Sequence, residues 1–247
     1  MEEKYEGGEI KIQSPFMKKI ENFWYHYKWH SLIALFLIVT ITVCTVQMFT
    51  REKYDLHVLY AGKSDIKQTA SDGLSEHRIL HASLKSMLED YDENGEVSLN
   101  LQTLFLPSAE EIEEINADLD IGYEVQTQVV VENQKQMDGL MLLSEYYLCF
   151  LSEANYLAYR DRAAGFFVSL TPYVGDASVS YYEGRTDAVY LSSTAFGTMP
   201  GWKDMADDTV ICLRSVSEVA RRSGKNNEKQ FARAEQTLRN LFAMKDS

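Results

Sequence analysis

Hydrophobic side chains form one long uninterrupted run near the start of the chain. Residues 31–49 read SLIALFLIVTITVCTVQMF, nineteen residues without a charge, a glycine or a proline. As a helix this run spans about 28 Å, close to the roughly 30 Å thickness of the hydrocarbon core of a bilayer. A soluble protein would need a large surrounding core to bury a helix that is apolar on every face. The pattern therefore predicts a single transmembrane helix.

A cleaved signal peptide is the main alternative for this run. Its apolar core is normally shorter, begins nearer the N-terminus and ends in small residues at a cleavage site. Here thirty residues precede the run, and residues 46–48 (VQM) are a poor cleavage signature. Thr40, Thr42 and Thr45 suit a membrane because a threonine hydroxyl can bond to the preceding helical turn. We therefore predict a retained anchor.

The flank of the run carries features of a membrane interface. Residues 23–30 (FWYHYKWH) contain five aromatic side chains, of the kind that favours the headgroup level of a bilayer. Further upstream, apolar residues recur every three or four positions, so residues 11–29 are predicted either as an amphipathic helix along the membrane surface or as a tail that orders only near Phe23.

Charge separates the two parts of the chain. The first fifty residues hold five Lys and five Glu, so the 19 basic and 32 acidic residues after position 50 carry the whole net charge of −13. An acidic domain repels nucleic-acid phosphates, which argues against nucleic-acid binding. The numbers of basic residues just before and just after the apolar run are nearly equal. The length of the C-terminal part favours its translocation across the membrane. We expect a cytoplasmic tail at 1–30, a transmembrane helix at 31–49 in the cell membrane and an extracytoplasmic α/β domain at 54–247.

The pattern after position 53 alternates between strand-like and helix-like segments. Ser108 and Glu111 have the spacing of a capping box, and Ser152 is predicted to cap a short helix. Strands separated by helices favour an α/β sandwich whose sheet is at least partly parallel. The strands are predicted at 54–60, 96–106, in a run from Gly139 to Phe150, in a hairpin at 181–196 and at 210–213. The helices are predicted at 73–89, from 108, at 122–137, at 152–162 and at 226–243.

Two local patterns resemble metal sites, and we favour a structural interpretation of both. Asp90, Asp92 and Asn94 match the first half of a calcium-binding EF-hand loop, but its twelfth position is Leu101, which offers no carboxylate. The segment is better explained as a turn at Asn94-Gly95. His77 and His81 have the i, i+4 spacing of zinc ligands, with Asp72 or Glu76 to complete the set, but exposed helical histidines are common. We predict no metal and no cofactor.

Cysteines and aromatic residues give further candidates. Cys149 and Cys212 lie in strand-like runs, where they are either two separate buried thiols or a disulfide between adjacent strands. Four aromatic residues in turn-rich regions are predicted either to line a ligand cleft or to fill the edge of the core. They are Tyr173, Tyr181, Tyr182 and Trp202. Motifs such as GxSxG and HExxH are not found in the sequence, so no catalytic residue is assigned.

Several segments together resemble a known group of proteins. The stretches WYHYKWHSLIALFLI, KYDLHVLYAG, YYLCFLSEANY and MPGW with DDTVICLR resemble uncharacterised single-pass membrane-anchored proteins of low-GC Gram-positive bacteria, over nearly the full length. The outer domain of that group is similar to extracytoplasmic solute-binding proteins. The resemblance implies a ligand-binding fold at the membrane surface, although about 190 residues form either one compact unit or two very small lobes.

The sequence thus favours a non-enzymatic binding or interaction module held at the bilayer. Its partner would be a small molecule, a component of the cell envelope or another membrane protein. One alternative is an accessory subunit of a transporter or secretion assembly, since Thr and Gln side chains in a span can serve helix–helix contacts. The other is a membrane-bound hydrolase that uses dispersed carboxylates.

Overall fold

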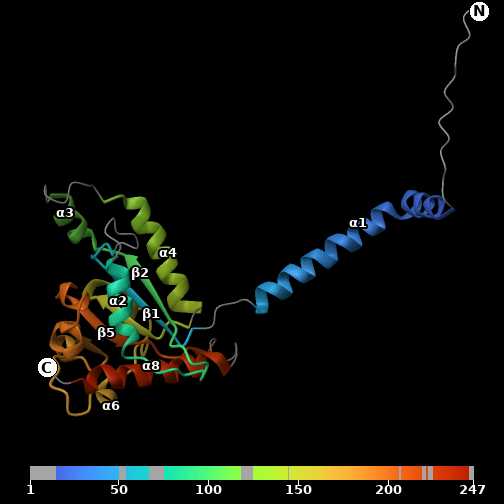
Figure 1. Cartoon of the computed structure of the whole chain (residues 1–247). Helices are drawn as coiled ribbons and strands as arrows, with labels where there is room; N and C mark the ends of the chain where they lie inside the picture. The colour runs from blue at the N-terminus through green and yellow to red at the C-terminus, as the bar shows by residue number, and fades with distance from the viewer. Residues whose placement is uncertain are drawn as a thin grey trace, which may run out of the picture. The chain divides into compact units, whose positions relative to one another are not determined.

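The computed structural model divides the chain into two compact units, one up to Glu52 and one from Lys53 to Ser247. The structure describes residues 15–49, 54–66, 75–117, 125–143, 145–205, 207–218, 221 and 225–244. Asp72 of the considered metal site lies outside the described residues, as do residues 11–14 of the predicted amphipathic helix. Each unit is described by itself below (Figure 1).

The described part of the first unit is one helix, α1 (Pro15–Phe49), which contains the whole apolar run. The helix begins at Pro15, so the alternative in which the chain orders only near Phe23 is wrong. Every described side chain from Phe23 to Val46 lies outside any core, which excludes the core helix of a soluble protein. The length and composition of α1 fit a membrane anchor, and they fit a signal sequence as well.

The threonines of α1 satisfy their own hydroxyl groups. Thr40 donates to the carbonyl of Phe36 at 2.9 Å, and Thr42 donates to the carbonyl of Ile38 at 2.8 Å. Thr45 makes the same bond one turn later, at 2.7 Å. A hydroxyl that bonds within its own helix needs no other partner in an apolar medium. These residues therefore do not require a neighbouring helix.

The second unit is built on one five-stranded sheet in the order β2-β1-β3-β5-β4. The strands are β1 (Leu56–Gly62), β2 (Leu99–Phe105), β3 (Leu148–Ser152), β4 (Ala188–Tyr190) and β5 (Thr209–Leu213). Strand β1 runs parallel to both β2 and β3, whereas β5 runs antiparallel to β3 and to β4. Only β5 therefore opposes the others, which confirms the expected mixed α/β sheet.

Helices cover both faces of the sheet, because side chains alternate between faces along each strand. Leu56, Val58 and Tyr60 of β1 pack on the face that also holds Leu80 of α2 (Glu76–Lys85) and Leu238 of α8 (Lys225–Ala243). On the other face, Leu59 and Ala61 pack with side chains of α4 (Thr127–Leu143) and α5 (Glu153–Arg160). The unit is thus a three-layer sandwich (Figure 1). Further helices in the described residues are α3 (Ala109–Ala117), α6 (Thr171–Val174) and the 3-10 turns η1 (Tyr182–Gly184), η2 (Leu191–Ser193), η3 (Ala195–Thr198) and η4 (Trp202–Asp204).

Both predicted helix caps are present. Ser108 accepts a hydrogen bond from the backbone N–H of Glu111 at 3.2 Å, and the Glu111 carboxylate accepts one from the N–H of Ser108 at 2.7 Å. These reciprocal bonds are the capping box that the spacing predicts. The Ser152 hydroxyl accepts from the N–H of Asn155 and caps α5.

Two predicted boundaries are wrong. Helix α4 does not end before Gly139 but continues to Leu143, because Met137 and Met141 are both buried on its inner face, and that packing outweighs the roughly 1 kcal/mol cost of a helical glycine. The hairpin at 181–196 is reduced to one bridge between Tyr181 and Val189. The chain after Tyr190 turns into η2 and η3 instead of a second long strand.

Cys149 and Cys212 lie directly opposite each other on β3 and β5, and both thiols are free and buried. The N–H of Arg214 bonds to the carbonyl of Tyr147 two residues away in the same register, so the cysteines also occupy a hydrogen-bonded pair. Such pairs hold their Cβ atoms farther apart, about 5.5 Å, than the roughly 3.5–4.5 Å that a disulfide needs. The register therefore favours two thiols over a disulfide.

Candidate functional site

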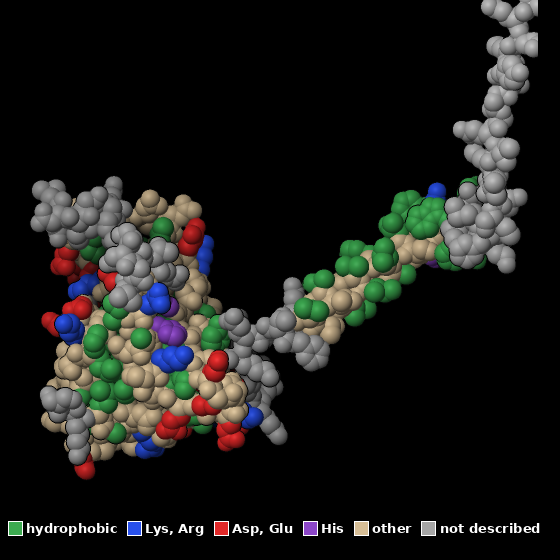
Figure 2. Space-filling view, in the orientation of Figure 1, with side chains coloured by type: hydrophobic (Ala, Val, Ile, Leu, Met, Phe, Trp, Pro, Cys, Tyr) green, Lys and Arg blue, Asp and Glu red, His purple; other side chains and the backbone are tan. Residues whose placement is uncertain are grey.

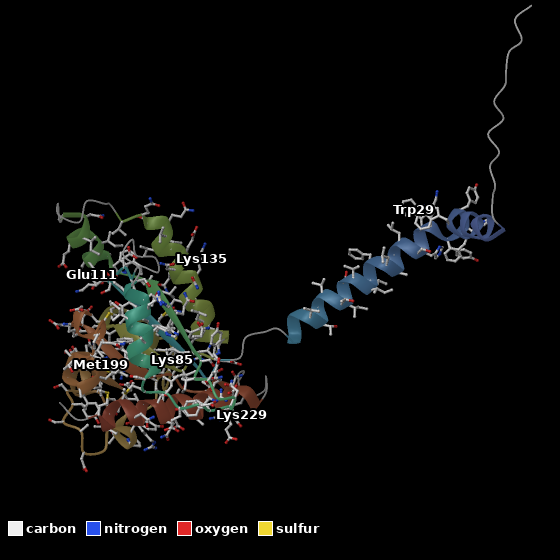
Figure 3. All side chains as sticks on the ribbon, viewed as in Figure 1. Trp29, Lys85, Glu111, Lys135, Met199 and Lys229 are labelled. Atoms are coloured by element: carbon white, nitrogen blue, oxygen red, sulfur yellow. The ribbon has the colours of Figure 1, made fainter. Side chains whose placement is uncertain are left out.

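The candidate site lies at the carboxyl edge of the parallel strands. Strand β1 stands between β2 and β3, so the connection from β1 to β2 and the connection from β2 to β3 leave in opposite directions. In open α/β sheets, ligands bind outside the carboxyl ends of the strands at such a switch point. Lys63 follows β1 here, and α3 with Glu111 follows β2 (Figure 3). Because β5 runs the opposite way, Asp208 reaches the same edge from the start of β5.

Lys63 stands between two carboxylates at this edge. Its Nζ lies 3.6 Å from Oε1 of Glu111 and 3.9 Å from Oδ1 of Asp208. The Lys63 side chain is about two-fifths exposed, whereas Glu111 is only 14% exposed. The three side chains, here called the edge cluster, carry a net charge of −1 when all are ionised.

The carboxyl group of Asp208 in the edge cluster has a shifted pKa. Burial raises its pKa above the ordinary value near 3.8, the charge of Lys63 opposes this, and the neighbouring Glu111 raises it further. Two carboxyl groups that share one site resist simultaneous ionisation. Tyr60 faces the same end of the sheet, and burial raises the pKa of its hydroxyl to about 12. Perturbed groups of this kind concentrate at functional sites.

Two buried oxygen atoms at this edge have no hydrogen-bond partner among the described residues. They are Oδ1 of Asp208, which has the 3.9 Å ion pair with Lys63 but no hydrogen bond, and Oγ1 of Thr209, the first residue of β5. Thr209 is 1% exposed, and its backbone is in register with Ser152 at the end of β3. A buried polar atom without a partner costs about 1–3 kcal/mol. A water molecule or the polar group of a ligand would relieve this cost, so the edge is suited to a small polar molecule.

Replacement of Asp208 by asparagine is expected to stabilise the fold at pH 7. When the pKa of a carboxyl group is higher in the folded state than in the unfolded state, the group stabilises the fold most below the unfolded pKa near 3.8. This stabilisation is lost as the pH rises through the folded-state pKa. Asparagine avoids that loss, so the melting temperature at pH 7 should rise by about 2–4 °C, the shift for roughly 1 kcal/mol in a domain of this size. The gain should shrink toward pH 3. Thermal melts of the full chain in detergent micelles, with the exposed Asp161→Asn as the matched control, measure this. An equal gain at both pH values would contradict the assignment.

The acidic loop at Asp90 is a turn, as predicted. The carboxylate of Asp90 accepts hydrogen bonds from the N–H groups of Asn94 and Gly95, at 3.2 and 2.7 Å, which hold its pKa below the ordinary range. Buried Asp55 joins Asp90 and Asp92 with ligand atoms within 4.8 Å of one another. Asp55, however, accepts from the N–H groups of Tyr91 and Ser98. Backbone donors thus occupy these carboxylates, and β2 follows where an EF-hand requires a helix.

His77 and His81 are brought together on α2, with ring centroids 6.2 Å apart. Each ring uses its Nε2 to bond a backbone carbonyl of β2, Leu101 for His77 and Leu99 for His81, both at 3.0 Å. These bonds hold the rings against the edge of the sheet. Among the described residues, the histidines are in no group of three ligands with suitable geometry.

The four aromatic candidates do not form one cleft. Trp202 is 1% exposed in the core on the α2 face, and Tyr182 is 3% exposed in the core on the α5 face. Tyr181 packs partly buried against the α2-face core. Tyr173 lines a cleft of about 620 Å³ between α6, η3 and the end of α8. There its hydroxyl donates to Glu235, and Arg239 stacks over its ring.

The edge cluster is not predicted by the sequence pattern. The pattern predicts Glu111 as part of a helix cap and gives no role to Lys63 or Asp208. The available signal is the position of these residues in the sequence. Lys63 and Asp208 flank predicted strands, and Glu111 lies at the start of the helix that follows a predicted strand. Comparison of the chain with models of protein families, with curated proteins and with solved structures found no match.

Proposed function

We propose that the chain is a membrane-tethered binding module, whose extracytoplasmic α/β unit takes a small polar ligand at the edge cluster. The observation that carries the proposal is that the apolar stretch of α1 is exposed all round, while the α/β unit has a complete core of its own. An apolar helix that packs in no protein core can bury its side chains in the hydrocarbon region of a bilayer. The single sheet supports a one-lobed relative of solute-binding proteins rather than a two-lobed clamp.

The chemistry of the edge cluster sets the kind of ligand. Glu111, Asp208 and the hydroxyl of Thr209 offer acceptors, and Lys63 offers a donor. A molecule with several hydroxyl or amino groups matches this set, because its donors would meet the carboxylates and its oxygens would meet Lys63. Tethering raises the local concentration of the module near membrane-bound partners, so modest affinity suffices.

The tether is tested by the size and location of the full chain in cells. With a tag at the N-terminus, the protein should stay in the pellet after an alkaline wash and should keep the tag. Loss of the tag and release into the medium would identify α1 as a signal sequence. Protease added to intact cells should digest residues 54–247, and their protection would place the α/β unit inside.

Ligand binding is tested on the full chain in detergent micelles. Melting temperatures are measured with a set of polyols, sugars and amines, and any stabilising compound is repeated on Glu111→Gln. A true ligand of the edge cluster should lose its effect on this variant and keep it on Glu228→Gln, which changes an exposed carboxylate of α8. Equal stabilisation of both variants would place the ligand elsewhere.

A second candidate function is carboxylate-dependent hydrolysis at the same edge. The raised pKa of Asp208, which lies beside a second carboxyl group, supports it, because such chemistry requires a carboxyl group that can act as a proton donor. Turnover of a ligand found in the binding experiment would favour this function. Loss of turnover with retained binding in Asp208→Asn would then identify the proton donor.

A further inference from the structure

The segment between α2 and β2 contains the one Asn-Gly pair of the sequence, at Asn94 and Gly95. Both residues are exposed. The hydroxyl oxygen of Tyr91 lies 3.1 Å from that of Thr237, which ties the segment to α8, and Figure 2 shows several Asp and Glu side chains at the surface where α8 lies. An asparagine side chain can react with the next backbone nitrogen when glycine follows, because glycine has no Cβ to obstruct the approach. The contacts of these two groups therefore decide what the pair can do.

The backbone nitrogen of Gly95 has a proton acceptor beside it. Its N–H donates to Oδ2 of Asp90 at 2.7 Å, which is within the reach of a general base. This bond is the main reason that the pKa of Asp90 lies below its ordinary value, so the carboxylate is ionised at neutral pH. Gly95 has a φ of +90°, and a Cβ placed on it would meet no atom within 4 Å. The nitrogen is therefore open to reaction on a side that no other group fills.

The side-chain carbonyl of Asn94 is also held in place. Its Oδ1 accepts a hydrogen bond from the N–H of Glu96 at 2.8 Å, which folds the side chain back over its own backbone toward the Gly95 peptide. The N–H of Asn94 donates to Asp90 at 3.2 Å and to Asp92 at 3.3 Å, so the backbone is fixed on both sides. A donor at a carbonyl oxygen stabilises the negative charge that develops there when a nucleophile attacks the carbonyl carbon.

We propose that Asn94 is a self-modification site, at which the nitrogen of Gly95 attacks Cγ of Asn94 and the side-chain amide is converted to a carboxylate. Asp90 takes the proton from the Gly95 nitrogen and passes it to Nδ2 of Asn94, which leaves as ammonia when the Cγ–Nδ2 bond breaks. The product is a five-membered cyclic imide. Water then opens one of the two C–N bonds of the imide, adding OH to the carbon and H to the nitrogen. Position 94 becomes aspartate or isoaspartate.

The modification changes both the charge and the length of the turn. It adds one negative charge beside Asp90 and Asp92, whose repulsion opposes the bonds that close the turn. In isoaspartate, the main chain also gains one carbon atom before Glu96. We therefore expect the modified turn to be looser. The reaction goes beyond the proposed ligand site and does not depend on it, since the turn and the edge cluster share no residue.

The test follows the full chain in detergent micelles at pH 7 over several weeks, and peptide mapping by mass spectrometry measures aspartate and isoaspartate at each Asn position. Asn94 should convert, whereas the exposed Asn116, which precedes alanine, should not. Asp90→Asn keeps an acceptor for the Gly95 N–H but removes the base, so it should slow the reaction at least about tenfold, a modest share of what a positioned base contributes. The matched control Asp92→Asn removes the same charge from the same turn and should leave the rate unchanged.

A second measurement separates the role of the fold from the reactivity of the Asn-Gly pair itself. Hydroxylamine attacks the cyclic imide and cuts the chain between residues 94 and 95, so the fragments report imide formation directly. In guanidinium chloride the turn is lost, and the native sequence and Asp90→Asn should then react at one rate. Equal or faster reaction of folded Asp90→Asn, equal slowing by Asp92→Asn, or conversion of Asn116 as fast as that of Asn94 would overturn the proposal.

Discussion

Replacement of Trp202 by alanine is expected to lower the melting temperature of the α/β unit by about 10 °C. The Trp202 ring is fully buried, and its centroid lies 4.4 Å from the Phe150 ring and 5.1 Å from the Phe196 ring. Its indole N–H donates to the carbonyl of Leu80 at 3.2 Å. Loss of a buried Trp side chain costs about 3–5 kcal/mol, and each kcal/mol moves the melting temperature of a domain this size by about 2–4 °C.

The measurement is a thermal melt of the full chain in detergent micelles, followed by circular dichroism. Trp29→Ala is the matched control, because it makes the same change on an exposed side chain of α1 (Figure 3). It should leave the melting temperature of the α/β unit unchanged. If Trp202→Ala lowers the melting temperature by less than about 3 °C, the Trp202 side chain of η4 does not pack as an integral part of this core.

Replacement of Leu37 and Ile41 together by aspartate is expected to move the protein out of the membrane fraction. These exposed residues lie one turn apart near the middle of the apolar run. A charged side chain at the centre of a transmembrane helix costs about 3 kcal/mol, so the pair costs about 6 kcal/mol. This free-energy penalty is comparable to the total free energy by which a moderately apolar segment prefers the bilayer to water.

The location of this variant is measured by ultracentrifugation of cell lysates after an alkaline wash, followed by immunoblotting. Leu37→Ala, Ile41→Ala shortens the same side chains without adding charge and should remain in the pellet. If the aspartate variant also stays there without aggregation, a part of the chain other than the apolar run must hold it.

Local sequence patterns predicted the features that depend on neighbouring residues. The apolar run of α1 is a property of its own composition. The capping box at Ser108 and Glu111 involves residues three positions apart. The strands near Tyr54, Val97 and Val210 follow from period-two alternation and β-branched residues, although β2 begins at Leu99 rather than at position 96.

Features that depend on distant residues could not be predicted in this way. Lys63, Glu111 and Asp208 are separated by 48 and 97 positions in the sequence, and only the strand order brings them together. The end of α4 was misplaced because Gly139 is a local helix breaker, whereas burial of Met141 is a tertiary effect. The aromatic candidates failed for the same reason, since Tyr182 and Trp202 belong to opposite faces of one sheet.

The attachment of the first strand has a mechanical consequence. The chain passes from the linker after α1 directly into β1, which forms seven register pairs with β2 and four with β3. Gln230 and Arg233 of α8 clamp the carbonyl of Tyr54 at the start of this strand. A pull on the linker would therefore load hydrogen bonds on both sides of β1 in shear, so that many must break at once. The α/β unit would therefore resist tension through the hydrogen bonds that join β1 to β2 and to β3.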